Sequence, residues 1–426
     1  MNYAEIVIAN ANENLDRVFH YGVPENLRNV IEVGMRVYVP FGMGNRRTEG
    51  YVIGFTDEID FDKSKIKNIY SIAERYAVIS SKRLQLAYWM KEKYYCSIGS
   101  AIMAITPKIV KEKTFRCVSV NEECDNLSEK IQQVLKKQTK QKAVLEMLLN
   151  GNVVPVSHIK NLLGVTDSPI DSLVKKGILV IENVQTYRGN CNFEYKSKTV
   201  APILNEEQLN AVNVLNDSIE NQYTRPILIK GVTGSGKTEV YMAAIEKALQ
   251  KGKQCIVLVP EISLTPQTVD RFVSRFGDKV AVTHSRLSDG ERYDQWNRAR
   301  KNEISVMIGP RSAIFTPFEN LGLVVIDEEH ETTYKSDQQN PKFDAREVAE
   351  KLGELYNSVT VLGSATPSIT SFYKAKNNIY KLVELNNRVN NTYPDVKIVD
   401  MRNELAEGNK SIFSRDLQNN ILKALS

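Results

Sequence analysis

The sequence predicts an α/β protein in which a parallel sheet with helices on both faces follows a β-rich N-terminal part and a smaller helical part. Three observations lead to this prediction. The apolar segment Arg225–Lys230 runs into a glycine-rich loop and then into the helical periodicity of Glu239–Leu249. Leu323–Ile326 is a continuous apolar run and Val359–Leu362 is apolar except for Thr360, as in strands buried on both faces. Near the N-terminus, apolar and polar residues alternate instead, for example in Met35–Val39.

Composition and length are ordinary for a globular protein. The chain has 426 residues, 25% charged and 42% hydrophobic, which predicts two to four domains. It has no apolar run near 18 residues, and Met1–Glu5 carries an acid where a secretory signal has basic residues, so we expect a cytoplasmic protein without a membrane contact. The chain has five cysteines and no C-x-x-C pair among them, so we expect free thiols and no zinc site within this chain. They are Cys96, Cys117, Cys124, Cys191 and Cys255.

Residues 1–107 are predicted to form a β-rich domain. Alternation in Met35–Val39 and Tyr51–Phe55, with Gly and Pro between the segments, predicts several short antiparallel strands or a small barrel. A helix is predicted over Ser81–Tyr95. Its aromatic residues are interpreted as core, with base stacking as the alternative.

Residues 108–200 are predicted to form a winged-helix domain. Lys142–Leu149, Val156–Leu163 and Ser168–Lys176 have helical patterns, and Ile178–Glu182 has the pattern of a wing strand. This part of the chain carries more Lys and Arg than Asp and Glu, although a charged face is usually only a solvated face. Such modules bind duplex DNA or other proteins, and both roles stay open.

The glycine-rich loop after Arg225–Lys230 matches G-x-x-x-x-G-K-[ST] in full. Its backbone N–H groups can point at phosphates, and the next helix adds its positive dipole end. Lys237 would reach the β/γ-phosphates and Thr238 would hold Mg²⁺. An ordinary glycine-rich turn is the alternative, but the strand–loop–helix context favours binding of a nucleoside triphosphate. The predicted cradle is Gly231, Val232, Thr233, Gly234, Ser235, Gly236, Lys237 and Thr238.

Two adjacent acids follow the apolar run Leu323–Ile326. Asp327 stands at the carboxyl end of Leu323–Ile326, where open parallel sheets place their ligands. There Asp327 can hold Mg²⁺, and Glu328 can orient or deprotonate the attacking water. A solvated turn is the alternative. Together with Lys237, these acids predict hydrolysis of the triphosphate.

In combination, the glycine-rich loop, Asp327–His330 and Val359–Ser368 resemble the first motor lobe of superfamily 2 helicases and translocases. The resemblance implies a RecA-like lobe over residues 201–426, contacts to single-stranded nucleic acid from Val257–Gln267, and coupling roles for Ser364 and Thr366. Together with other segments of the chain, these motifs resemble more specifically the primosomal protein N′ family of replication-restart helicases. The segments that carry this narrower resemblance are Phe19–Pro24, Gly34–Gly42, Leu204–Gln208, His284–Trp296 and Gly309–Phe315.

The family resemblance also implies roles for individual side chains. Gln208 would recognise adenine, and ATP with Mg²⁺ would be the cofactors. Tyr334 and Phe343 would stack on DNA from an aromatic-rich loop, or would simply pack. His20 stands where relatives have an acid that can accept a bond from a 3′-hydroxyl. The DNA-binding candidates are Phe19, His20, Gly42 and Lys67, which would line a pocket for a 3′-terminal nucleotide, together with Arg311, Tyr334 and Phe343.

By this resemblance the intact protein would be a monomeric ATP-dependent 3′→5′ DNA helicase that recognises stalled forks and initiates primosome assembly. Its partners would be forked and single-stranded DNA, primosome proteins and the single-stranded-DNA-binding protein. The family's Zn²⁺ sites and second motor lobe are expected beyond this chain, so we expect the chain alone not to unwind DNA. Two alternatives are a motor that moves on duplex without unwinding, and a fork-binding platform with little ATPase activity.

Overall fold

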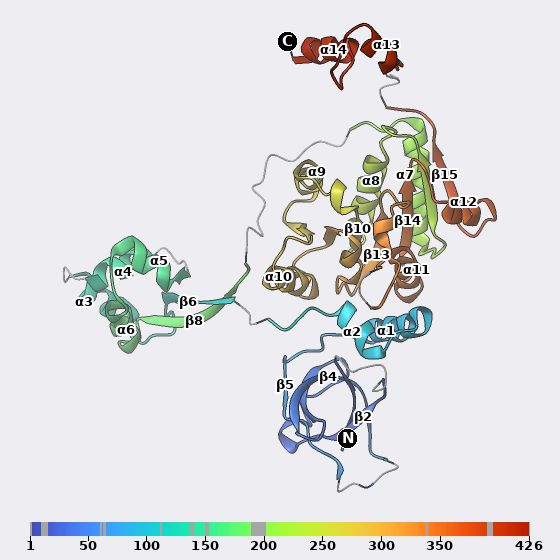
Figure 1. Cartoon of the computed structure of the whole chain (residues 1–426). Coiled ribbons are helices and arrows are strands. Elements are labelled where there is room, and N and C mark those ends of the chain that lie inside the picture. Colours follow the sequence, from blue (N-terminus) through green and yellow to red (C-terminus); the bar gives the residue numbers. More distant parts are fainter. Residues whose placement is uncertain are drawn as a thin grey trace.

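The computed structural model describes residues 2–9, 16–59, 62, 65–110, 113–136, 140–149, 153–188, 202–337, 340–389 and 395–425. These residues form an N-terminal unit (2–107), a middle unit (113–186) and a C-terminal lobe (202–389), followed by two short helices (Figure 1). The predicted α/β class is confirmed. Cys191 lies outside the described residues; the other four cysteines are free thiols.

The N-terminal unit is built on a five-stranded antiparallel sheet. Its order is β2-β1-β4-β3-β5. Backbone hydrogen bonds from Gly22 to Lys67 and from Ile69 to Gly22 join the end of β2 to the segment just before β5, so the two edges of the sheet meet. The predicted alternating segments therefore form part of a small, barrel-like sheet. Its strands are β1 (Tyr3–Ile8), β2 (Phe19–Gly22), β3 (Arg36–Phe41), β4 (Arg46–Thr56) and β5 (Ser71–Ile72).

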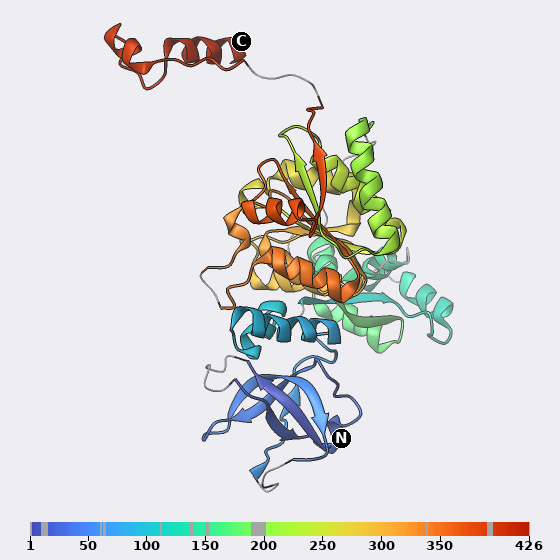
Figure 2. The same ribbon diagram turned by 90° about the vertical axis from the view of Figure 1, so that its right-hand side faces the viewer.

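Two helices, α1 (Ser81–Tyr94) and α2 (Ile98–Ile105), lie between this sheet and the C-terminal lobe (Figures 1 and 2). Their buried residues share one apolar cluster with helices of the lobe. Arg83, almost completely buried, donates from its guanidinium to the backbone carbonyls of Ile314 and Thr316. The N-terminal unit is therefore joined to the lobe by a continuous core.

The aromatic residues of the α1 region divide between two environments. Trp89 and Tyr94 pack against that core in an edge-to-face pair with ring centroids 5.6 Å apart. Tyr95, directly after the helix, is exposed. The core interpretation is therefore confirmed for Trp89 and Tyr94 only.

The middle unit combines four helices with a three-stranded sheet. The three predicted helices are present, and the predicted wing strand is longer and pairs along its whole length with β6, which the sequence did not predict. Helix α3 was also not predicted, because its residues are mostly polar. The sheet order is β7-β6-β8. The elements are β6 (Lys113–Val120), α3 (Leu127–Leu135), α4 (Lys140–Leu148), β7 (Val154–Pro155), α5 (Val156–Leu163), α6 (Asp167–Lys175) and β8 (Leu179–Thr186).

The C-terminal lobe has a seven-stranded parallel sheet of order β11-β12-β10-β13-β14-β9-β15. Alternate residues of the central strands enter different cores: Val361 packs on the α7–α9 side and Leu362 on the α10–α11 side. This explains the continuous apolar runs, since both faces are covered. The strands are β9 (Ile227–Gly231), β10 (Gln254–Leu258), β11 (Val280–Val282), β12 (Val306–Gly309), β13 (Leu321–Ile326), β14 (Val359–Ser364) and β15 (Lys381–Leu385).

Six α-helices of the described lobe surround this sheet. They are α7 (Glu206–Asn221), α8 (Lys237–Gln250), α9 (Pro266–Phe276), α10 (Asp289–Arg300), α11 (Ala345–Tyr356) and α12 (Ile369–Lys376). Beyond β15, at the end of the molecule far from the N-terminal sheet, lie α13 (Met401–Ala406) and α14 (Arg415–Leu425) (Figure 2). Where the structure describes helices, none combines the length and apolar character needed to cross a bilayer.

Candidate nucleotide site and nucleic-acid surfaces

The order of the parallel strands brings the predicted catalytic segments together. Strand β14 lies between β13 and β9, and all three run in the same direction. Their carboxyl ends therefore meet at one edge of the sheet, which is where such sheets bind ligands. Gly231, Asp327 and Ser364 stand at these three ends.

The glycine-rich loop between β9 and α8 is folded as a cradle. Gly234 and Gly236 have φ angles of +80° and +79°, which residues with a side chain rarely adopt. The ammonium of Lys237 is nearly buried and donates to the carbonyl of Gly231 at 2.9 Å, inside its own loop. The hydroxyl of Ser235 is buried and has no hydrogen-bond partner among the described residues. The cradle thus holds a cation and an unused hydroxyl, both suited to phosphate oxygens.

Gln208 reaches this loop from the first turn of α7. Its side-chain oxygen accepts from the Asn205 backbone and its amide donates to the Ser235 carbonyl, each at 2.9 Å. Asn205 accepts from the backbone of Gln208 in turn, which completes a capping box. A Cβ at Gly236 would collide with the Gln208 side chain, so glycine is needed here for space as well as for its φ angle. Gln208 therefore fixes the position of the loop.

Asp327 is half-buried beside the cradle, at the end of β13. Loss of solvent on burial, and next the charge of Glu328, raise the pKa of Asp327 to about 6, although Lys237 and Tyr241 oppose the shift. The Tyr241 hydroxyl donates to its carboxylate at 3.2 Å. A carboxylate here and the half-buried Thr238 on α8 are hard oxygen donors of the kind that Mg²⁺ takes. Among the described residues, no three His, Cys, Asp or Glu form a metal site, so phosphate and water would complete the coordination.

Glu328 has a backbone φ of +47°, in the left-handed region that residues with a Cβ rarely occupy. Its carboxylate lies 3.6 Å from Nδ1 of His330. That nitrogen also lies 2.7 Å from the Ser364 hydroxyl, which accepts from the backbone of Thr366 at 3.0 Å. The structure therefore joins the acidic segment after β13 to the hydroxylated segment after β14.

Two residues at this edge were missed by the sequence reasoning. Tyr241 fills the space beside Gly363, where even a Cβ would collide with its hydroxyl. Burial raises the pKa of the Tyr241 phenol far above its usual range, so it stays a hydrogen-bond donor to Asp327. Glu329 is completely buried and is bonded to Ser368 and Ser371. Gly363 was a sequence signal for a close approach, but its partner could not be identified without the fold.

The four candidates of the N-terminal unit lie together. Phe19, His20, Gly42 and Lys67 line one surface pocket of about 820 Å³. Lys67 donates to the Gly42 carbonyl at 3.1 Å. Opposite His20 in the sheet stands Glu5, whose carboxylate is 3.7 Å from the imidazole Nε2. An acid therefore lies next to His20.

The two aromatic candidates after β13, Tyr334 and Phe343, do not lie on the surface, where stacking on DNA would need them. Tyr334 and Phe343 are buried, with 1% and 7% of their surfaces exposed. The Tyr334 hydroxyl donates to the Asp327 carbonyl at 2.6 Å, and Phe343 packs edge-to-face on Phe315. Stacking on DNA needs an exposed ring, so base stacking is wrong for this conformation and packing, the alternative, holds. Arg311 is half-buried and donates to the Lys335 carbonyl at 2.9 Å.

Comparison with known families gives matches to two parts of the chain. Residues 5–107 match the family described as the PriA 3′DNA-binding domain, and residues 205–374 match the DEAD/DEAH box helicase family. The second match contains the glycine-rich loop, Asp327 and Ser364. The chain is similar to the replication restart protein PriA. A helicase domain of this kind implies the use of nucleotide and Mg²⁺.

The similarity to PriA proteins extends over the whole chain. It is 33% identical to PriA of Bacillus subtilis, across 100% of this chain and 61% of the relative. PriA of Chlamydia trachomatis is 34% identical across 96% of this chain and 55% of the relative. A solved structure of RecG bound to a three-way DNA junction is 26% identical, with a TM-score of 0.35, across 49% of this chain and 27% of that one. The chain thus spans between half and two thirds of the PriA relatives it matches end to end.

The cleft geometry predicts different effects for its two charged residues. Lys237→Ala should weaken ATP affinity by roughly tenfold to a hundredfold, about 1.4 to 2.8 kcal/mol, because a phosphate partner is lost. Glu328→Gln should keep the affinity within about threefold, since a residue that acts on water adds little to binding. Titration with a fluorescent ATP analogue measures both, and Lys251→Ala at the far end of α8 is the control. Loss of binding in Glu328→Gln would contradict the role given to Glu328.

The raised pKa of Asp327 predicts how Mg²⁺ binding depends on pH. Below about pH 6 the carboxyl group is protonated and is a poor Mg²⁺ ligand, so the gain in ATP affinity from Mg²⁺ should fall through this pH. Because the Glu328 charge raises this pKa, Glu328→Gln should move the loss to lower pH. ATP-analogue titrations with and without Mg²⁺ from pH 5 to 8 measure the shift. An unchanged pH profile in Glu328→Gln would show that the two carboxylates do not interact.

Proposed function

We propose that this chain carries the fork-recognition and ATP-binding part of an ATP-dependent 3′→5′ DNA helicase that restarts stalled replication forks. One observation carries the proposal: a single chain joins a phosphate cradle facing two acids to a unit that matches a 3′DNA-binding domain, through a shared apolar core. A nucleotide-driven change in the lobe would then act directly on the unit that holds DNA.

In this proposal Lys237 neutralises phosphate charge, Thr238 and Asp327 hold Mg²⁺, and Glu328 orients the attacking water. Gln208 lies against the Ser235 carbonyl and can turn its amide to adenine when nucleotide enters. The remaining cradle residues, Gly231 to Gly236, offer backbone N–H groups to the phosphates. When bound, Mg²⁺ would lower the charge repulsion between the phosphates and the two acids.

The pocket of the N-terminal unit would receive the 3′-terminal nucleotide of a nascent strand. Phe19 offers a half-buried ring for the base, and Lys67 a cation for the backbone phosphate. His20 stands at the position of the acid in relatives, but Glu5 lies beside it and can accept a hydrogen bond from the 3′-hydroxyl through the imidazole or directly. The pair would replace the single acid.

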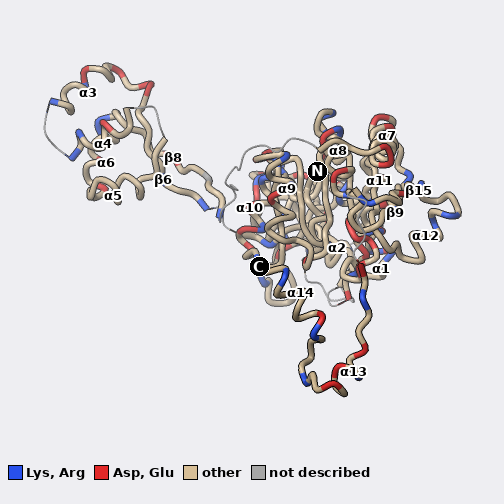
Figure 3. Tube along the Cα trace, turned by 90° about the horizontal axis from the view of Figure 1, so that it is seen from above, with Lys and Arg blue, Asp and Glu red and all other residues tan. Residues whose placement is uncertain are grey.

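We assign domain boundaries at 1–107, 108–200 and 201–426 as part of the same proposal, with the middle unit as a winged helix. In the view of Figure 3, Lys and Arg residues are interspersed with Asp and Glu along the described chain. DNA contact by the middle unit is therefore proposed from its fold and not from its charge. A monomer acting in the cytoplasm on forked and single-stranded DNA, with primosome proteins and the single-stranded-DNA-binding protein as partners, completes the proposal.

Release of phosphate from ATP distinguishes this proposal from a fork-binding platform with an idle ATPase. With protein in excess over ATP, the chain should release phosphate at a rate that Glu328→Gln lowers by about a hundredfold or more. Mixing with forked DNA beforehand tests whether DNA changes that rate. A rate that Glu328→Gln leaves unchanged would be contaminating activity and would favour the platform.

The N-terminal pocket predicts a preference among fork ends. A fork whose leading strand ends in a 3′-hydroxyl should bind about tenfold tighter than the same fork with a 3′-phosphate, because the phosphate brings about −1.5 to −2 charges to a pocket next to Glu5. The preference should fade in His20→Ala and Glu5→Gln. Fluorescence anisotropy at fixed salt measures it, since salt alone changes DNA affinity.

Lys67→Ala should weaken the binding of both forks, whereas Arg28→Ala, an exposed basic residue of the same unit outside the pocket, is the matched control. Equal affinity for both fork ends in the unmodified chain would show that this pocket does not recognise the 3′ end.

A further inference from the structure

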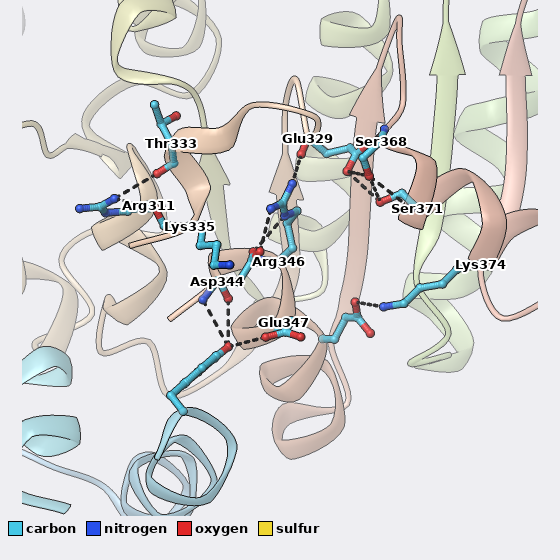
Figure 4. A network of polar contacts seen from close by, with 12 residues as sticks. Arg311, Glu329, Thr333, Lys335, Asp344, Arg346, Glu347, Ser368, Ser371 and Lys374 are labelled. Atoms are coloured by element: carbon cyan, nitrogen blue, oxygen red, sulfur yellow. Dashed lines mark hydrogen bonds and ion pairs between the residues drawn. The ribbon is translucent and has the colours of Figure 1, made fainter. Parts of the chain in front are cut away.

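Glu329 is completely buried, and its peptide and carboxylate are both held by hydrogen bonds. Its N–H donates to the Gly363 carbonyl at 2.9 Å, and its own carbonyl accepts from Nη1 of Arg346 at 2.7 Å. One carboxylate oxygen accepts from the backbone of Ser368 at 2.6 Å. The other accepts from the hydroxyls of Ser368 at 3.1 Å and Ser371 at 2.8 Å. Figure 4 shows the contacts of Glu329 with Arg346, Ser368 and Ser371.

Each of these partners is itself fixed. Arg346 makes two bonds to the Asp344 carboxylate, Nε to Oδ1 at 2.9 Å and Nη2 to Oδ2 at 2.7 Å, while Asp344 caps the start of α11. Ser368 caps the start of α12, where its hydroxyl accepts from the backbone of Ser371. Glu329 thus connects the amino ends of two helices that pack on the sheet.

The residue directly before it, Glu328, is held much less firmly through its own side chain. About a third of that side chain is exposed, and its carboxylate lies 3.6 Å from the imidazole Nδ1 of His330. Its backbone is strained at φ +47°. A non-glycine residue stays in this region only when its surroundings impose it. The residues on both sides of Glu328 are held by backbone hydrogen bonds. The Asp327 N–H donates to the Leu258 carbonyl and the Glu329 N–H to the Gly363 carbonyl, each at 2.9 Å.

We propose that Glu329 is a positioning residue for Glu328: its buried carboxylate holds the strained peptide in place so that the Glu328 carboxylate faces the nucleotide cleft. The proposal rests on the ATP hydrolysis proposed above. Without the Glu329 anchor, the chain from 328 to 331 can relax toward an ordinary backbone conformation, and the Glu328 side chain turns away. Glu329 does not touch the nucleotide, so its loss affects turnover and not binding.

The sequence supports this division of work between neighbouring acids. Burying a carboxylate without hydrogen-bond partners costs much free energy. Buried carboxylates are therefore usually found where hydrogen bonds satisfy their oxygens. An apolar residue of similar size at 329 could fill the space but would form no hydrogen bonds from the segment after β13 to α12. The side chain of Glu329 is therefore suited to holding two segments at a fixed distance.

Three variants test the proposal. In Glu329→Ala the single-turnover rate of ATP cleavage should fall by roughly tenfold to a hundredfold, as expected for a misplaced catalytic group, with affinity for a fluorescent ATP analogue within about threefold of the unmodified chain. Glu329→Gln should recover most of that rate, because its amide oxygen still accepts from the Ser368 backbone and the serine hydroxyls can turn to accept from its NH₂ group. Glu331→Ala, which removes an acid two residues away, should behave like the unmodified chain.

Amide hydrogen exchange supplies a measurement that needs no cleavage. In Glu329→Ala, exchange should become faster in peptides that cover 326–331 and stay unchanged in the cradle, 231–238. An unchanged cleavage rate and unchanged exchange would overturn the proposal. So would faster exchange throughout the lobe together with loss of nucleotide binding, since that result describes a residue needed only for folding.

The failure of hydrolysis itself is distinguishable from the failure of this inference. The proposed function fails if the unmodified chain releases no phosphate, or releases it at a rate that Glu328→Gln does not lower. The exchange measurement then decides alone: faster exchange confined to 326–331 supports the anchor, and unchanged exchange overturns it.

Discussion

The parallel pairing of β13, β14 and β9 is the constraint on which the rest of the structure depends. These strands are buried on both faces, so a shift of register would move side chains between two different cores and is strongly disfavoured. The fixed register places Gly231, Asp327 and Ser364 at one edge. Since the three segments are separated by many residues along the chain, only this pairing gives the site its geometry.

Polar contacts then connect that edge to the rest of the molecule. Arg346 holds the Glu329 carbonyl and pairs with Asp344, and the Tyr94 hydroxyl, from the N-terminal unit, donates to Glu347 at 2.9 Å one residue further on. Tyr94 also lies 3.4 Å from the Asp344 carbonyl. The helix that rests on the barrel-like sheet therefore touches the same turn of α11 that anchors the acidic segment. Movement of this turn would shift packed residues in both units, because the two units share one core.

Local patterns were sufficient for the parts of the fold and site that depend on local physics. The glycine-rich loop and the buried strands were predicted because glycine conformation and apolar periodicity act over a few residues. Strand β6 was missed because its first four residues are exposed and its partner β8 lies some 60 residues away in sequence. The burial of Tyr334 and Phe343, and the anchoring of Glu329, depend on contacts between distant segments that no local pattern contains.

The arrangement also explains why the segment after β13 has acids at three successive positions with three different environments. Asp327 is half-buried, and loss of solvent and the neighbouring Glu328 charge raise its pKa to about 6, so its carboxylate would respond to an arriving Mg²⁺ ion. Glu328 is half-exposed and strained, which leaves its carboxylate accessible to water. Glu329 is buried and satisfied by serine and backbone donors. Because the chain turns here, the three side chains leave it in different directions, so one turn can present one acid to metal, one to water and one to the core. The left-handed conformation of Glu328 creates that turn, so the strain at this residue is the structural cost of separating the three environments.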